Sequence, residues 1–145
     1  MERNLSVVRK EQKGVLEEIN FITGAMIPAL KRIGGQAYIG LWYIQDDVEE
    51  YADLSADLTK RIKTLERLKQ EEENILHDCK KLYNQILEQS AIMEDAANAL
   101  RNAYMPTVCE TLANMRDDAE IEMYNADVKL TYLIGNEKID FSKID

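Results

Sequence analysis

The sequence contains few residues that break helices. It has six glycines and two prolines, and none of these eight lies between Gly40 and Pro106. Folds rich in β-structure need turn residues inside a stretch of that length. The gap therefore argues against a β-sandwich, a β-barrel and alternating β/α units, and it favours long helices.

Cysteine, histidine and long apolar runs are also scarce. The two cysteines, Cys79 and Cys109, form no Cys-x-x-Cys pair, and His77 is the single histidine. This set is too small for a disulfide framework or a zinc signature, so we predict no catalytic, metal-binding or cofactor-binding residue. No apolar run reaches the roughly 18 residues of a membrane span, and the first residues do not resemble a signal peptide. We expect a cytoplasmic protein, although export without a cleaved signal is compatible with this composition.

Basic residues are outnumbered by acidic ones. The chain has 18 Lys and Arg against 27 Asp and Glu, which gives a net charge of −9. Binding of nucleic acid relies on neutralising phosphates with Lys and Arg, so we expect no direct nucleic-acid partner. The length of 145 residues and the 46% apolar content are typical of one folded domain, here residues 1–145.

Apolar residues recur at alternating spacings of three and four, which is typical of helices with one packing face. The pattern predicts helices at about 4–33, 36–68, 74–104 and 107–125. Gly24 and Pro28 predict a kink or a break near 24–28, because proline removes a backbone donor inside a helix. The stripe predicted for the two central segments comprises Leu41, Ile44, Val48, Tyr51, Ser55, Leu58, Ile62, Leu65, Lys69, Glu72, Leu76, Cys79, Tyr83, Ile86, Ser90, Met93, Ala97, Leu100 and Tyr104. The last helix has Val108, Leu112, Met115 and Ala119.

The charged segment 69–73 allows two arrangements of the central helices. The order of charges, acidic then basic up to Lys69 and acidic again from Glu71, matches the helix dipoles of two arms joined by a turn. The unbroken spacing and the pair Arg67–Glu71 instead favour one continuous helix of about 65 residues. We favour the turn. The predicted fold is therefore all-α, an elongated, coiled-coil-like antiparallel bundle of three or four helices with a long central hairpin.

The C-terminal segment 126–145 has a different pattern. Val128, Leu130, Tyr132 and Ile134 alternate with other residues and are followed by Gly135-Asn136, which predicts a short β-like hairpin or a loose tail. An isolated two-stranded ribbon is marginal in water. The tail therefore packs on the helices, pairs with another chain or stays disordered.

The helical stripes and a crowded aromatic segment at 38–44 predict a non-enzymatic protein-interaction module. Such an adaptor, chaperone or scaffold subunit would act by coiled-coil or helix-in-groove packing. Its partner would be another protein, a second copy in a dimer, or both. The candidate contact residues are Trp42, Tyr43, Tyr51, Leu58 and Tyr132.

The acidic run after this segment indicates an alternative function. An acidic surface can imitate nucleic acid and block a basic, nucleic-acid-binding partner, as anti-CRISPR and anti-restriction proteins do. The candidate residues for such a surface are Asp46, Asp47, Glu49, Glu50, Asp53 and Asp57.

Overall fold

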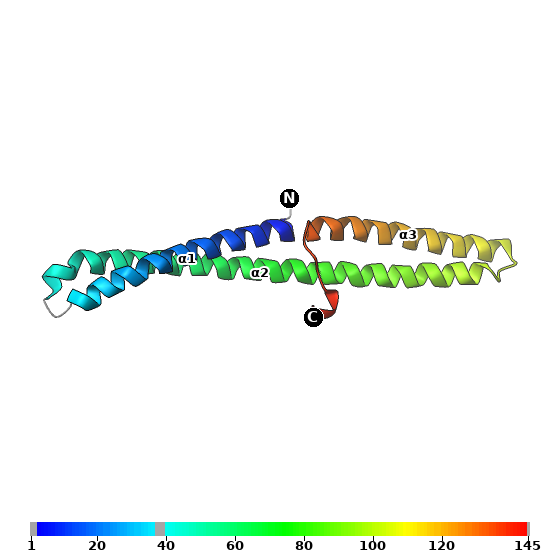
Figure 1. The fold of residues 1–145 in the computed structure, drawn as a ribbon. Helices are drawn as coiled ribbons and strands as arrows, with labels where there is room; N and C mark the ends of the chain where they lie inside the picture. The colour runs from blue at the N-terminus through cyan, green and yellow to red at the C-terminus, as the bar shows by residue number, and fades with distance from the viewer. Residues whose placement is uncertain (1–2, 37–39, 145) are drawn as a thin grey trace. The chain divides into compact units, whose positions relative to one another are not determined.

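In its described residues, the chain forms three long α-helices and one short 3-10 helix (Figure 1). The computed structural model describes residues 3–36 and 40–144, and at residues 36 and 41–43 it describes the backbone alone. The elements are α1 (Leu5–Gln36), α2 (Leu41–Leu100), α3 (Pro106–Ile134) and the 3-10 helix η2 (Phe141–Lys143). These described ranges contain no strand, so the all-α prediction is confirmed.

The helices form two compact units, and both units contain part of α2. The α1/α2 unit comprises Val7–Glu72, and the α2/α3 unit comprises Met1–Ser6 together with Glu73–Asp145. Each unit is built on two helices joined by a reversal of the chain. The two helices of such a unit pack along one line of contact, and the side chains on that line form most of its core.

The predicted turn at 69–73 is wrong, because α2 continues through this segment for 60 residues. The chain reverses instead beside helix breakers. Gly40, with φ of 123°, precedes α2, and Met105 is extended immediately before Pro106, which lies in the first turn of α3. A charge near a helix end contributes only about 0.3–1 kcal/mol, which is too little to open a helix that contains no breaker.

The predicted break near residues 24–28 is also absent, since α1 contains both Gly24 and Pro28 and extends to Gln36. Packing explains this continuity. Ala29 is fully buried and Ile33 is half-buried beyond the proline. Contacts on both sides of Pro28 thus offset the backbone hydrogen bond that the proline cannot make.

The β-like prediction for the start of the tail is wrong, because α3 continues to Ile134. Residues two apart on a helix differ by about 200° and point to opposite sides. Leu130 is buried, whereas Val128 and Tyr132 are exposed on the other side of the same helix. The alternation came from a helix with two apolar faces.

The rest of the tail, residues 135–144, packs on the helices of the α2/α3 unit. Gly135 ends α3 with φ of 64°, and the Asn136 N–H donates to Ser6 Oγ at 2.7 Å. A side chain at residue 135 would collide with Ser6. The Phe141 ring stacks on Tyr83 with 4.4 Å between ring centroids.

The packing face of α2 departs from the predicted stripe at three positions, whereas Ser55, Leu76, Tyr83, Ser90 and Ala97 are half-buried as predicted. Ile44, Tyr51, Leu58, Leu65, Glu72 and Cys79 are buried or half-buried as predicted, but Val48, Ile62 and Lys69 are exposed. Eight residues outside the predicted stripe also lie on this face, each three positions after a residue of the stripe. These are Asp47, Leu54, Arg61, Leu68, Ile75, Leu82, Gln89 and Ala96, all buried or half-buried.

In the α1/α2 unit, polar residues on this packing face pair across the two helices. Gln12 Nε2 donates to Glu72 Oε2 at 2.6 Å and to the Leu68 carbonyl at 3.2 Å. Nearer the other end of the unit, Arg61 pairs with Glu18 at 2.9 Å, and Arg32 pairs with Asp47 at 2.9 Å. Residue numbers fall along α2 as they rise along α1, so the two helices are antiparallel.

A proline substitution at Lys69 tests the continuity of α2. We expect Lys69→Pro to lower the free energy of unfolding by about 3 kcal/mol, because it removes a hydrogen bond inside a helix. Lys69→Ala is the control, since residue 69 is exposed. Denaturation followed by circular dichroism measures both variants, and equal stabilities would indicate a turn.

A double-mutant cycle tests the Gln12–Glu72 pair. We expect a coupling energy of about 1 kcal/mol between Gln12→Ala and Glu72→Ala, because the hydrogen bond is charge-assisted and partly buried. Urea denaturation of the two single variants and the double variant gives this value. Strictly additive effects would contradict a direct interaction.

Candidate protein-interaction surface

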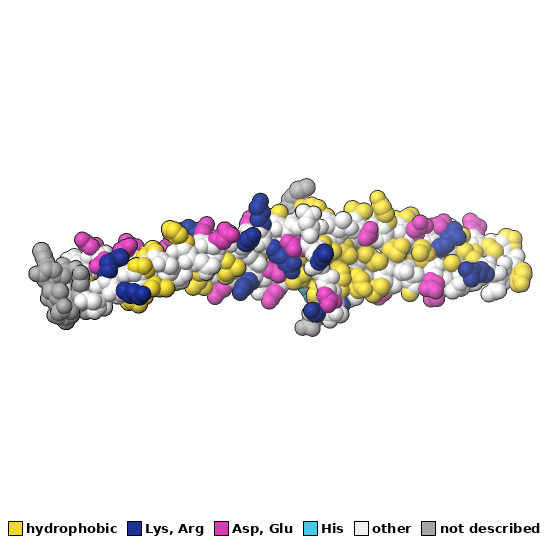
Figure 2. Space-filling model, viewed as in Figure 1, with side chains coloured by type: hydrophobic (Ala, Val, Ile, Leu, Met, Phe, Trp, Pro, Cys, Tyr) yellow, Lys and Arg dark blue, Asp and Glu magenta, His cyan; other side chains and the backbone are white. Residues whose placement is uncertain are grey.

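Apolar side chains are unevenly buried in this protein. Among the described residues, thirteen apolar side chains are buried, while seventeen large ones are exposed. Figure 2 shows hydrophobic side chains gathered over the α2/α3 part of the chain. Exposed apolar area of this kind commonly marks a binding surface.

The outer side of α3 carries a second line of apolar residues, which we call the outer stripe. It consists of Ile121, Tyr124, Val128 and Tyr132, whose exposed fractions are 58%, 67%, 50% and 41%. At about 100° per residue these positions fall within an arc of about 80°. The buried residues Ala119, Ala126, Leu130 and Leu133 lie on the opposite side of the helix.

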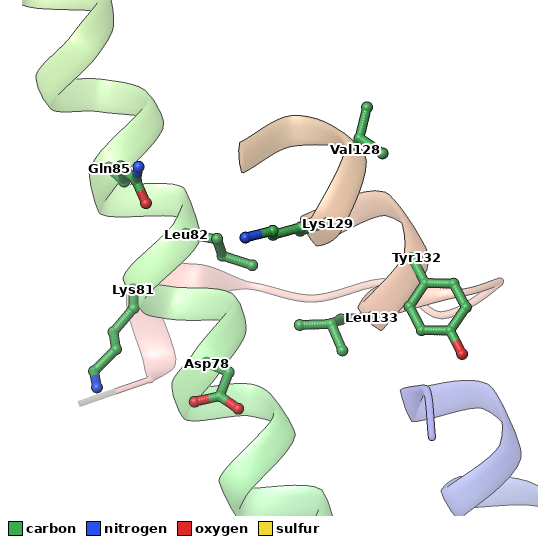
Figure 3. Close-up of a pocket in the computed structure, with 8 residues that line it drawn as sticks. All are labelled: Asp78, Lys81, Leu82, Gln85, Val128, Lys129, Tyr132 and Leu133. Atoms are coloured by element: carbon green, nitrogen blue, oxygen red, sulfur yellow. The ribbon is translucent and has the colours of Figure 1, made fainter. Parts of the chain in front are cut away.

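A groove between α2 and α3 adjoins the outer stripe. Its volume is about 690 Å³, which is in the range of pockets that hold large groups. Figure 3 shows Lys129 and Leu133 extending toward Leu82, whereas Lys81 points away from α3. The groove is lined by Asp78, Lys81, Leu82, Gln85, Val128, Lys129, Tyr132 and Leu133. Val128 and Tyr132 thus belong to both the groove and the stripe.

The charge around the outer stripe is negative. Exposed carboxylates of Asp117, Asp118, Glu120 and Asp127 lie on or beside the stripe, and Arg116 donates to Asp117 at 3.2 Å. Over residues 73–145 the sequence has fourteen acidic and seven basic residues, against twelve and ten over residues 7–72. The net charge of the chain is therefore concentrated in the α2/α3 unit.

The tail forms a polar clamp on α2 in the same unit. Lys80 Nζ donates to the Phe141 carbonyl at 2.7 Å and lies 5.7 Å from the centre of the Tyr83 ring. The Asp140 carboxylate accepts hydrogen bonds from the Ser142 hydroxyl at 2.6 Å and from the Ser142 N–H at 3.1 Å. These two hydrogen bonds, and to a lesser extent the charge of Lys80, lower the pKa of Asp140 below its usual value.

The predicted contact residues do not form one site. Tyr132 is part of the outer stripe and the groove. Tyr51 and Leu58 are half-buried on the α2 packing face of the α1/α2 unit. The side chains of Trp42 and Tyr43 lie outside the described residues.

The predicted acidic surface is partly engaged within the chain. Arg32 bonds Asp47 at 2.9 Å and Glu50 at 2.8 Å, and these contacts raise the pKa of Arg32. Asp57 lies 3.5 Å from Arg61. The remaining three residues, Asp46, Glu49 and Asp53, are exposed.

The sequence interpretation missed Ile121, Tyr124 and Val128 as a surface. Their spacings of three and four continue to Tyr132 and are those of a helix face. The signal was present, but the period-two interpretation of residues 128–134 concealed it. A helix with two opposite apolar faces produces both periodicities in the same segment.

Within the described part of the chain, no group of three or more His, Cys, Asp or Glu side chains is arranged to hold a metal ion. None of its helices combines the length and the apolar character needed to cross a membrane. Comparisons with protein-family models, curated proteins and solved structures found no match.

Removal of the Ser142 hydroxyl tests the tail clamp. We expect Ser142→Ala to raise the pKa of Asp140 toward its usual value, because the strongest hydrogen bond to the carboxylate is lost. A depressed pKa means that ionised Asp140 favours the folded tail above the usual Asp pKa. This contribution disappears as the pH falls through the pKa of the folded state.

Carboxyl NMR titration measures the Asp140 pKa in the native protein, in Ser142→Ala and in a control variant. Ser90→Ala, a substitution on α2, is the control and leaves that pKa unchanged. The same Asp140 pKa in Ser142→Ala and in the native protein would contradict the assigned hydrogen bond.

Proposed function

We propose that this protein is a non-enzymatic interaction module, an adaptor, chaperone or scaffold subunit that binds another protein by helix packing. One observation carries the proposal. The outer stripe presents four large side chains at helical spacing on a helix whose opposite face is already packed. Such a stripe is the surface that a partner helix covers in helix-in-groove recognition.

The energetics support binding through this face. Full burial of a large apolar side chain is worth about 1.5–3 kcal/mol, so four half-exposed residues offer a substantial gain. Tyrosine, present twice in the stripe, is common among the residues that dominate binding energy. The adjoining groove offers space for a large side chain from the partner.

The alternative function, an acidic inhibitor acting through residues 46–57, has weaker support. Asp47 and Glu50 bind Arg32 in the same unit, which reduces the free negative charge on that surface. Asp57 lies near Arg61. The acidic residues around the outer stripe, by contrast, lie beside a line of exposed apolar side chains.

Affinity capture from a lysate of the cells that produce this protein tests the proposed function. We expect the native protein to retain a specific partner and Ile121→Ser/Val128→Ser to retain at least about tenfold less of it, because apolar contacts are lost. The variant should unfold within about 0.5 kcal/mol of the native protein, since both residues are exposed.

Leu87→Ser is the matched control. Leu87 is 52% exposed on α2 and is not part of the outer stripe. Its capture should equal that of the native protein. Identical capture by all three proteins, together with a monomeric state in light scattering, would contradict binding through this face.

A further inference from the structure

We propose that the outer stripe of α3 binds a basic amphipathic α-helix from a different protein. This inference rests on the proposed function and specifies the chemistry of the partner. The partner helix carries apolar residues at spacings of three and four, with Lys or Arg on both sides of that line. Three properties of the surface support this assignment: its length, its charge and its groove.

The length of the stripe suits a short helix. The stripe spans twelve residues, from Ile121 to Tyr132 inclusive, which corresponds to about 17 Å along the axis of α3. A partner of about three helical turns covers this distance. Three or four apolar residues on its facing side would contact Ile121, Tyr124, Val128 and Tyr132.

The charges beside the stripe select the sign of the partner. At about 100° per residue, Glu120 and Asp127 lie on one side, and Asp118 lies on the other side with Lys129. Asp117 falls on the stripe itself, where it pairs with Arg116 at 3.2 Å. The four carboxylates outnumber these two cations, and all four are exposed. Complementary Lys and Arg on the partner would increase the association rate and exclude acidic helices, whose approach is repelled.

The groove adds a position for one large apolar side chain. Val128 and Tyr132 lead from the stripe to a space bounded by Leu82 and Leu133. The charges at the rim are mixed, because Asp78 is accompanied by Lys81 and Lys129. The cations of the partner therefore belong near residues 117–120, and its largest apolar residue belongs at the groove.

Neither α3 nor the basic segment Lys60–Lys69 of a second copy fits this surface well. Residues 106–134 contain six acidic and two basic residues, so two α3 surfaces would carry charge of the same sign. The basic segment Lys60–Lys69 could supply cations, but Leu65 and Leu68 lie on the packing face of α2. Only Ile62 remains exposed there, which does not form an apolar line.

Three fluorescein-labelled helical peptides of 18 residues test the charge preference against the full-length protein. The first has a leucine stripe flanked by lysines, the second the same stripe flanked by glutamates, and the third has lysines with serine replacing leucine. Fluorescence anisotropy at physiological salt measures each affinity. We expect the first peptide to bind at least about tenfold more tightly than either of the others.

Two pairs of substitutions identify the surface used. Asp118→Lys/Glu120→Lys should reverse the preference between the lysine and glutamate peptides. Glu88→Lys/Glu94→Lys, an equal charge change at exposed positions of α2, is the control and should preserve the preference. Ile121→Ser/Val128→Ser should weaken binding of the lysine peptide at least about tenfold, while Leu87→Ser should not.

Several results would overturn the proposal. Equal binding of the lysine and glutamate peptides, with loss in Ile121→Ser/Val128→Ser, would disprove the basic partner and leave the proposed function standing. Equal binding of the serine peptide would indicate attraction by charge alone. Absence of binding by all peptides would disprove the assignment, as would a dimer in sedimentation that Ile121→Ser/Val128→Ser dissociates.

Discussion

Packing along a single repeating line of α2 is the constraint on which the rest of this structure depends. Residues spaced three and four apart from Ile44 to Leu100 lie against α1 in one unit and against α3 in the other. A pair of helices buries only the side chains along the contact between them. Any further apolar residue stays at the surface, and the outer stripe of α3 is the consequence.

Polar residues on this packing face determine which residues of the α1/α2 unit meet. An entirely apolar repeat would allow two helices to shift by one heptad at little cost, whereas a polar pair is satisfied in one register. Gln12 and Glu72 form such a pair, and Arg32 with Asp47 forms another. The charged segment 69–73, which suggested a turn, therefore contains Glu72, and Glu72 fixes the register of α1 against the continuous helix α2.

A structural feature could be predicted from the sequence where the competing structures require different residue types. The all-α class followed from the lack of glycine and proline between Gly40 and Pro106. The gap between the predicted helices 74–104 and 107–125 agrees with the start of α3 at Pro106. On α2, positions such as Tyr51, Leu58 and Cys79 were identified, but Ile75 and Leu82, which are also buried or half-buried, were missed. Leu76 and Tyr83 are as apolar as Ile75 and Leu82, so apolarity alone does not decide between the residue three and the residue four positions later.

The sequence by itself determined that the chain is helical, that apolar residues line its helices and that acidic residues outnumber basic ones. Tertiary structure alone decided which side of each helix is covered, because that depends on where the neighbouring helix lies. Residues 128–134, which were predicted to form strands, belong to a helix with one buried and one exposed apolar face. The proposed interaction surface lies on that exposed face, which α2 leaves uncovered.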